Sequence, residues 1–426
     1  MTENGQIRVL WTTNIVLPGI AQIVGVPRTP FGGWLVQMLQ ALSKRQGIVL
    51  GVAMLSSVKK LTRVERDGVV YFALPKTNSN DIRQSDCERV LNQFKPDILH
   101  AQGSELAFTR RFFKCAAGPK ILSMQGILNG IAPYQLGCLS LRSLLNPMHP
   151  RDALVGVALW LNYRLRFRPR LEVERQTFLL ADYVIGRTNW DRAHSSQLNS
   201  KAEYRQCAEI MRPEFHGRTW SPDDCEPQTI FIGSSASPLK GVHIALRAIA
   251  LLKRRYSDIK VYIAGSDPRR VSRFSLRGQL GYQAYLLSLI SRLALEETIH
   301  FTGELMAEEM AERLCNANVY LLPSLIENSP NTLCEAMLMG VPSVAAYVGG
   351  VPSIANDNND ALLYRANDPV MLAFQIQRLF DDRSLCRKLS SASRIRSIAA
   401  QDIKKNVDIV NAIYRGAVGR NAPTQL

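Results

Sequence analysis

The chain has 426 residues, of which 46% are hydrophobic, and a formal net charge of +16 at pH 7. This length exceeds one ordinary hydrophobic core and predicts two domains of about 200 residues each. Eight cysteines without a C-x-x-C pair argue against a zinc site and against a disulfide framework. No segment is long and apolar enough for a transmembrane helix, and the start, MTENGQIRVLW, lacks an apolar signal segment, so we expect a cytoplasmic protein. The positive charge favours anionic partners without choosing among phosphates, nucleic acid and an anionic membrane.

The first half of the chain alternates apolar strand patterns with helical ones, as α/β proteins do. Helices are expected from about residue 32 and over 82–94. In an open parallel sheet, ligands bind beyond the carboxyl ends of the strands. The residue pairs Gly32–Gly33, Gln102–Gly103 and Gln125–Gly126 are therefore candidates for a binding cleft. The expected strands are 7–13, 48–55, 69–75, 96–103, 120–126 and 182–188.

The second half repeats this alternation after a polar, proline-bearing linker at 212–228. Strands are expected at 229–236, 259–265, 299–305 and 319–324, and helices at 240–256, 282–295, 369–379, 384–398 and 401–416. The repetition predicts two domains of the same class.

One further helix is predicted directly after the strand at 319–324. Ser329 is a good N-cap, and Pro330 fits the first helical position, where its missing N–H costs nothing. Gly340, followed by Val-Pro, is a stop signal. We therefore expect a helix over about 330–339.

Two carboxylates flank the start of this predicted helix. Glu335 lies one turn beyond Asn331 on the same face, in an otherwise apolar or small run where a buried charge is costly unless paired. The N–H groups of Asn331, Thr332 and Leu333 would make the helix start an anion site, and Glu327 precedes it in the loop. A phosphate that carries hydroxyl-rich groups on both sides would suit this arrangement. The alternative is that Glu335 lies on a solvated stripe and that the ENSPN loop only caps the helix.

Residues 142–175 mix seven arginines with aromatic and leucine side chains. One interpretation is a core helix followed by a solvated basic loop. The other is a surface that rests on an anionic membrane, with apolar side chains at the headgroup boundary and arginines against lipid phosphates. The side chains concerned are Trp160, Leu161, Tyr163, Leu165, Phe167, Arg164, Arg166 and Arg168.

Several motifs together resemble the retaining glycosyltransferases of family 4, also called the group 1 glycosyltransferases. The strongest is ENSPNTLCE, residues 327–335, which is similar to the family's E-x7-E motif and is followed by G-x-P and G-G elements. The K-G segment within 231–265 and the stretches FTGEL and NANVYLLPS also fit. In the first half the likeness is looser, in PDILHAQG, ILSMQG and ADYVIGRTNWDRA.

The resemblance implies an α/β protein of the GT-B fold, with two Rossmann-like domains that face each other across a cleft. It divides the chain into an acceptor-binding domain at 1–211, the linker at 212–228 and a donor-binding domain at 229–398. The last segment, 399–426, would be a helix that crosses back to pack on the first domain.

The resemblance also implies a role for individual residues in binding a nucleotide diphosphate sugar. Glu335 would bind the ribose hydroxyls, and Lys240 would pair with the diphosphate. Glu327 would contact the donor sugar. The remaining donor-binding residues would be Ser329, Pro330, Asn331 and Thr332 at the helix start and Gly303, Glu304 and Leu305 beside the base.

In the first domain, the resemblance places Gly32 and Gly33 on the acceptor side and Gln125 against the donor sugar. The family commonly has a histidine where Gln125 stands; a neutral glutamine can still hydrogen-bond sugar hydroxyls, but it carries no charge. The family also commonly has an arginine soon after Gly233, where this chain has Ser234. Diphosphate neutralisation therefore depends more on Lys240. We expect Glu327, Lys240 and Gln125 to take part in the reaction itself.

The implied chemistry is sugar transfer with retention at the anomeric carbon, without a metal or another cofactor. The donor would be UDP- or GDP-linked, and the acceptor lipid-linked or a saccharide, in cell-surface polysaccharide biosynthesis on the inner face of the cytoplasmic membrane. A nucleotide-sugar hydrolase or epimerase on the same fold is the alternative. A NAD-dependent dehydrogenase is disfavoured because TTNIVLPG, without G-x-G-x-x-G, follows the first strand, and no nucleic-acid-binding module is recognised.

Overall fold

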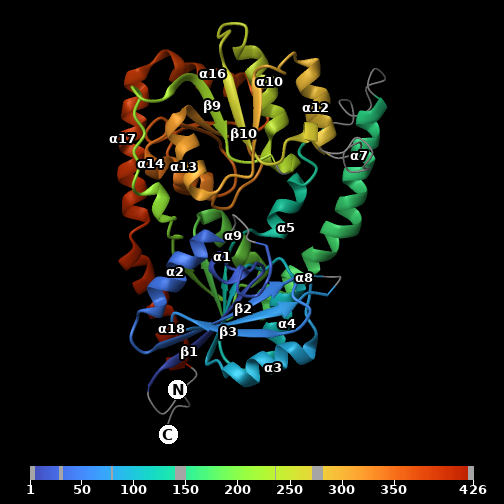
Figure 1. The fold of residues 1–426 in the computed structure, drawn as a ribbon, viewed down its shortest axis with the longest axis vertical. Helices are drawn as coiled ribbons and strands as arrows, with labels where there is room; N and C mark the ends of the chain where they lie inside the picture. The colour runs from blue at the N-terminus through green and yellow to red at the C-terminus, as the bar shows by residue number, and fades with distance from the viewer. Residues whose placement is uncertain are drawn as a thin grey trace. The chain divides into compact units, whose positions relative to one another are not determined.

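The computed structural model describes residues 5–27, 32–77, 80–139, 150–235, 237–270 and 282–420. The chain forms two compact units (Figure 1). Unit 1 contains Met1–Gly130, Pro169–Arg212 and Ala400–Leu426, and unit 2 contains Ile131–Arg168 and Pro213–Ala399. Each unit is built around a largely parallel sheet with helices, so the predicted α/β class is confirmed.

The sheet of unit 1 has the strand order β3-β4-β2-β1-β5-β6-β7-β8. Its strands are parallel except β3, which pairs antiparallel with β4. Six of these strands lie where the sequence predicted them, whereas β3 and β8 were missed because neither has a buried residue in its pattern. The strands are β1 (Ile7–Thr13), β2 (Ile48–Ser56), β3 (Thr62–Arg66), β4 (Val69–Pro75), β5 (Ile98–Gln102), β6 (Lys120–Ser123), β7 (Tyr183–Gly186) and β8 (Glu203–Gln206).

Alternate residues of β1 supply the hydrophobic cores on the two faces of this sheet. Val9 and Trp11 pack in a core with α2 and α18, and Leu10 packs in the other core with residues of α3 and α4. This division follows from the two-residue period of side chains along a strand. The helices of unit 1 are α1 (Pro18–Ala21), α2 (Gly33–Ser43), α3 (Gln84–Phe94), α4 (Ala107–Cys115), α8 (Arg168–Leu179), α9 (Asn189–Leu198) and α18 (Ile403–Arg420).

The C-terminal helix α18 packs in unit 1 against α2, β1 and β5, as the resemblance implied. Tyr414 anchors it, because its buried hydroxyl accepts a hydrogen bond from Trp11 Nε1 at 2.9 Å and lies 2.6 Å from His100 Nδ1. The other ring nitrogen of His100 lies 2.7 Å from Ser123 Oγ. This polar chain fixes the helix to three strands of the sheet.

Unit 2 has the strand order β11-β10-β9-β12-β13-β14, and its paired strands are parallel. The order reverses between β9 and β12, which is the point where open α/β sheets bind ligands. The strands are β9 (Glu226–Ile232), β10 (Lys260–Ala264), β11 (Ile299–Gly303), β12 (Ala317–Leu322), β13 (Ser343–Ala346) and β14 (Leu362–Tyr364). The helices are α7 (Pro150–Asn162), α10 (Val242–Leu252), α12 (Tyr282–Arg292), α13 (Ala307–Asn316), α14 (Asn331–Met339), α15 (Val351–Ile354), α16 (Pro369–Asp381) and α17 (Arg383–Ala400), with α5 (Leu128–Ile131) at the boundary of the units.

The contacts differ from the expected division in the middle of the chain. Residues 131–168, expected within 1–211, group with unit 2, where α7 packs against α12. The end of the expected linker, from Glu226, already belongs to β9. The interpretation of residues 142–175 as a core helix followed by a basic loop is wrong for the loop, because residues 150–179 are helical throughout, with a π-helical turn at Tyr163–Phe167. Residues 142–149 of the arginine-rich stretch lie outside the described residues.

Tyr414→Phe should lower the free energy of unfolding by about 1–3 kcal/mol, because it leaves Trp11 Nε1 and His100 Nδ1 buried without this hydroxyl. Urea denaturation measures the change. Tyr347→Phe is the matched control, since Tyr347 is 61% exposed and should tolerate the change. Equal stability of Tyr414→Phe and the parent would show that this polar chain does not anchor α18.

Stability should also fall on acidification, because burial lowers the pKa of His100 to about 3. An unfolded histidine titrates near 6.5, so between pH 6.5 and 3 the unfolded chain binds the extra proton and the unfolding free energy decreases as the pH falls. His100→Gln should make this dependence shallower in denaturation series at stepped pH, with the exposed His216→Gln as control. Parallel curves for His100→Gln and the parent would contradict the assignment.

Candidate functional site

The candidate site of unit 2 lies at the carboxyl ends of β9 and β12, where the strand order reverses. The loop after β9 carries Lys240, and the loop after β12 carries Glu327. The two loops touch, because Leu325 N donates to Leu239 O at 2.8 Å. Gly241 permits this approach: its φ is +66°, and a Cβ there would lie 1.9 Å from Pro323 O.

Lys240 and Glu327 form an ion pair although 87 residues separate them in sequence. Nζ of Lys240 lies 2.6 Å from Oε1 of Glu327, which also accepts a hydrogen bond from Ser324 Oγ at 2.7 Å. The Glu327 carbonyl accepts from Gly350 N at 2.9 Å. Two of the three side chains expected to act in the reaction therefore lie together, and three loops hold Glu327 there.

Helix α14 begins beside this pair, one residue later than expected. Its N-cap is Pro330, without a side-chain capping bond, so the assignment of Ser329 as N-cap is wrong. Pro330 has an extended ψ of 108°, which keeps it outside the helix, and its carbonyl accepts from Leu333 N at 3.1 Å. The N–H of Leu333 is thus used within the helix start, and Asn331 and Thr332 supply the first N–H groups at the positive end of the helix dipole.

Thr332 is fixed against the strands beneath it. Its Oγ1 lies 2.6 Å from the hydroxyl of Tyr320, which is buried in β12. Burial raises the pKa of Tyr320, and the nearby carboxylates of Glu327 and Glu335 act in the same direction, so its hydroxyl stays neutral. A Cβ at Gly233 would lie 3.1 Å from Thr332 Cγ2, so the end of β9 passes closely under the helix start.

Glu335 is only 4% exposed, so the interpretation of this residue as part of a solvated stripe is wrong. It lies in the middle of α14, directly before four residues that are themselves buried, Ala336 to Met339. A carboxylate in such surroundings requires hydrogen-bond donors. The helix start therefore combines N–H groups, one lysine and two carboxylates within unit 2.

Gly303 is the last residue of β11, and Glu304 and Leu305 follow it, at the same carboxyl edge of the sheet as the candidate site. Gly303 has a φ of +82°, and its carbonyl accepts from Gly265 N at 2.9 Å, which ties the ends of β11 and β10 together. Glu304 is exposed. These three residues are two strands away from β9.

The expected residues of unit 1 lie beyond the carboxyl ends of its own strands. Gly32, with a φ of +88°, is the N-cap of α2, and a Cβ at Gly33 would lie 2.5 Å from Arg212 Cδ. Gln125 follows β6 and lines a cavity of about 50 Å³.

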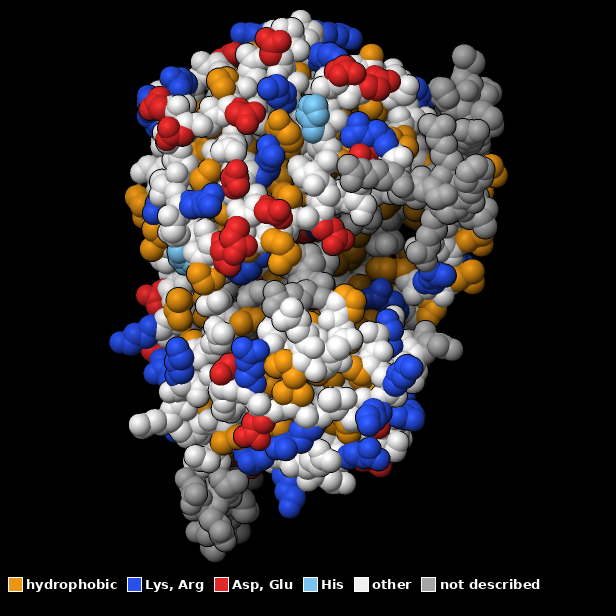
Figure 2. Space-filling view, in the orientation of Figure 1, with side chains coloured by type: hydrophobic (Ala, Val, Ile, Leu, Met, Phe, Trp, Pro, Cys, Tyr) orange, Lys and Arg blue, Asp and Glu red, His pale blue; other side chains and the backbone are white. Residues whose placement is uncertain are grey.

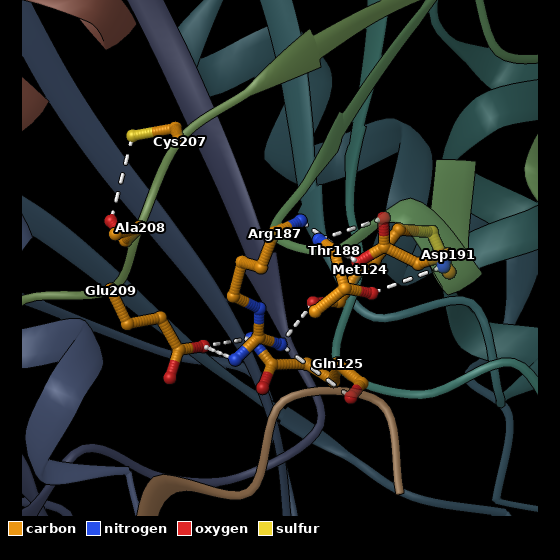
Figure 3. A network of polar contacts seen from close by, with 8 residues as sticks. All are labelled: Met124, Gln125, Arg187, Thr188, Asp191, Cys207, Ala208 and Glu209. Carbon is orange, nitrogen blue, oxygen red and sulfur yellow. Dashed lines mark hydrogen bonds and ion pairs between the residues drawn. The ribbon is translucent and has the colours of Figure 1, made fainter. Parts of the chain in front are cut away.

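Sequence reasoning missed the partners of Gln125. Figure 3 shows that Arg187 and Glu209 form an ion pair, with 2.8 Å between Nη1 and Oε1, and that Gln125 Nε2 donates to Glu209 Oε1 at 3.2 Å. Arg187 lies near the end of the strand predicted over 182–188 and directly follows the observed β7, so its place at a strand end was a usable signal. Glu209 follows the strand β8, which the sequence did not reveal.

Residues 226–382 match the family described as "Glycosyl transferases group 1". A relative, the MMP alpha-(1->4)-mannosyltransferase of Mycolicibacterium hassiacum, is 29% identical over 194 residues, which are 45% of this chain and 44% of the relative. The putative colanic acid biosynthesis glycosyltransferase WcaL of Salmonella typhimurium is 28% identical over 174 residues, 39% of each chain. The chain thus matches less than half the length of these relatives. Within residues 226–382, the predicted resemblance to the group 1 glycosyltransferases is confirmed.

Two solved structures share the fold over nearly the whole chain. Sucrose-phosphate synthase from Thermosynechococcus elongatus has a TM-score of 0.73 at 16% identity and covers 98% of this chain and 100% of its own. HepE from Anabaena in complex with UDP-glucose has a TM-score of 0.63 at 17% identity, with 96% and 100% covered. The fold is that of the GT-B glycosyltransferases, as predicted.

Gly241→Ala should separate the loops that carry Lys240 and Glu327, because the new Cβ meets the Pro323 carbonyl and the backbone is left-handed. We expect a loss of about 1–3 kcal/mol in unfolding free energy. Gly217→Ala is the control in the same unit, since a Cβ there meets nothing within 4 Å. Denaturation curves that are the same for both variants would refute the proposed constraint.

Proposed function

From the match of residues 226–382 to the group 1 glycosyltransferases, we propose that this protein transfers a sugar from a nucleotide diphosphate donor to an acceptor hydroxyl. The observation that carries the proposal is the meeting of Lys240, Glu327 and the start of α14 at the β9–β12 switch point. A helix N-terminus and a lysine suit a diphosphate, and carboxylates suit the hydroxyls of ribose and sugar.

In this proposal, each part of the donor binds the residues whose chemistry suits it. The diphosphate lies against the N–H groups of Asn331 and Thr332, behind the Ser329–Pro330 loop. The ribose lies at Glu335, the transferred sugar at Glu327, and the base beside Gly303–Leu305. Lys240 can turn from Glu327 to the diphosphate, because Ser324 Oγ still donates to Glu327 at 2.7 Å.

The reaction proceeds with retention. The bond between the anomeric carbon and the phosphate oxygen breaks, and the acceptor oxygen forms its bond on the same face while its proton passes to the leaving phosphate. Lys240 and the first turn of α14 stabilise the charge that develops on the diphosphate. Gln125 contacts the donor sugar. The proposal calls for no metal and no cofactor.

The relatives suggest the substrate classes. The HepE structure contains UDP-glucose, which supports a UDP-sugar, with GDP-sugars as the other class to test. The relative named for colanic acid biosynthesis supports a role in cell-surface polysaccharide assembly. The acceptor is then a saccharide or lipid-linked saccharide, received on the side of Gly32 and Gly33.

To reach a lipid-linked acceptor, the protein would have to bind a membrane, and α7 carries a surface suited to that. No helix among the described residues is long and apolar enough to cross a bilayer. Four apolar side chains nevertheless stand exposed along α7 and its π-helical turn, and the Arg164 guanidinium carbon lies 5.5 Å above the ring of Trp160, itself half exposed. Figure 2 shows hydrophobic beside basic side chains over α7, at the right of the view. The four are Leu154, Val157, Leu161 and Leu165.

We place this surface on anionic lipid at the cytoplasmic face of the membrane. Arg164, Arg166 and Arg168 are exposed next to the apolar side chains. Each arginine near an anionic surface contributes about 1 kcal/mol, and the leucines and Trp160 enter the headgroup boundary.

Glu335→Gln and Lys240→Ala should each lower kcat/KM for the nucleotide sugar at least about tenfold, equivalent to about 1.4 kcal/mol, without unfolding the protein. The measurement is sugar transfer and free-sugar release with UDP-, GDP-, ADP- and TDP-sugars, with and without acceptor. Lys260→Ala, exposed in β10, is the control. Unchanged kinetics in both variants would contradict the donor site, and sugar release without transfer would favour the hydrolase alternative.

Changing Arg164, Arg166 and Arg168 together to Gln should abolish flotation with anionic liposomes at low salt, because it removes the charge that meets the lipid. Changing Lys388, Lys404 and Lys405 to Gln removes the same charge from exposed positions elsewhere and should leave flotation intact. Flotation is also measured with neutral liposomes and at high salt. Absence of binding by the parent, or binding insensitive to lipid charge and salt, would remove the membrane surface and favour a soluble acceptor.

A further inference from the structure

Gln125, Arg187 and Glu209 come from the ends of three neighbouring strands in unit 1. They follow β6, β7 and β8, whose carboxyl ends meet at one edge of the sheet. Figure 3 shows the Arg187 guanidinium between the Glu209 carboxylate and the backbone of Met124 and Gln125. The loop that carries Gln125 is thus held in place by Arg187, which follows the neighbouring strand β7.

The ion pair is buried and braced. The side chains of Arg187 and Glu209 are only 7% and 13% exposed. Arg187 donates to the carbonyls of Met124 and Gln125, and its backbone N–H donates to Asp191 Oδ2 at 2.8 Å. A buried ion pair adds little net stability compared with apolar packing, so its value lies in specifying a geometry.

The geometry that the pair specifies is the orientation of the Gln125 amide. A carboxylate only accepts hydrogen bonds, so the amide nitrogen of Gln125 must face Glu209 Oε1, 3.2 Å away. If the amide turned over, two oxygens would face each other. The carbonyl oxygen Oε1 of Gln125 is therefore the atom presented to a ligand.

The cavity beside this network supports a positioning role. Gln125, Arg187 and Glu209 line it together with His100 and Ser123, but its volume of about 50 Å³ has room for water rather than for a sugar ring. Arg187 and Glu209 therefore act through Gln125 instead of touching the sugar themselves.

We infer that Arg187 and Glu209 are positioning residues that hold Gln125 as a hydrogen-bond acceptor toward the transferred sugar; this rests on the proposed function. The sugar group that meets Gln125 is then a hydrogen-bond donor, a hydroxyl or an amide N–H, and not a carboxylate. A glutamine held in one orientation thus makes a directed hydrogen bond at the position where the family commonly has a histidine. It lacks the charge that a protonated histidine could carry.

The test is a double-mutant cycle on sugar transfer. One variant combines Arg187→Met with Glu209→Gln, so that neither charge is left buried without its partner. The second is Gln125→Ala, and the third combines all three changes. Arg111→Met with Asp81→Asn removes another ion pair of unit 1 and is the matched control.

We expect the pair variant and Gln125→Ala each to lower kcat about tenfold while the Kd of UDP stays within about twofold. The triple variant should be no slower than Gln125→Ala, since the pair acts through Gln125. Three results would each overturn the inference. They are a triple variant in which the two losses of kcat multiply, a parental kcat in the pair variant, and a parental kcat in Gln125→Ala. If the parent transfers no sugar from any donor, the proposed function itself fails, which is a different result.

Gln125→Glu tests the same contact with the pair intact, should the pair variant not fold. Its new carboxyl would lie beside Glu209, and two carboxylates at hydrogen-bond distance cannot both ionise without penalty. We expect kcat of this variant to fall as the pH rises from about 5 to 8, while Gln125→Asn follows the parent. A parental pH profile for Gln125→Glu would place residue 125 away from Glu209 and overturn the inference.

Discussion

The approach of the loop after β9 to the loop after β12 is the constraint on which the candidate site depends. Only a residue without a side chain fits at Gly241, where a Cβ would lie 1.9 Å from Pro323 O. That approach brings Lys240 to 2.6 Å from Glu327 and places both next to the first turn of α14. At a switch point, the connections that follow the two neighbouring strands lead away in opposite directions, so the site needs such a clamp to bring its charges together.

The hydrogen bonds of Glu327 suit exchange of Lys240 with a ligand. Glu327 has two donors, Lys240 and Ser324, so it keeps one when the lysine turns to another anion. Glu335 is buried on the next turn of α14. Glu327 is only 12% exposed, and in such partly buried surroundings these interactions are stronger than in water.

The sequence predicted most of what local pattern determines and little of what long-range packing determines. The carboxylate Glu335 stood out because an apolar run surrounds it, and it is buried. The cap at Ser329 failed because the extended Pro330 takes that position, a difference of one residue that capping rules do not resolve. The strand β3 was missed because it is polar, and residues 131–168 were assigned to the wrong neighbours because the packing of α7 on α12 leaves no local signal. The pair of Arg187 with Glu209 is likewise visible only once β7 and β8 are neighbours.

The most direct test of the proposed donor site is a crystal structure of the protein grown with UDP or GDP. We expect the diphosphate at the N–H groups of Asn331 and Thr332, within hydrogen-bond distance of Lys240 Nζ, with the ribose hydroxyls on Glu335. A nucleotide bound elsewhere, or bound here with its ribose turned away from Glu335, would contradict this assignment.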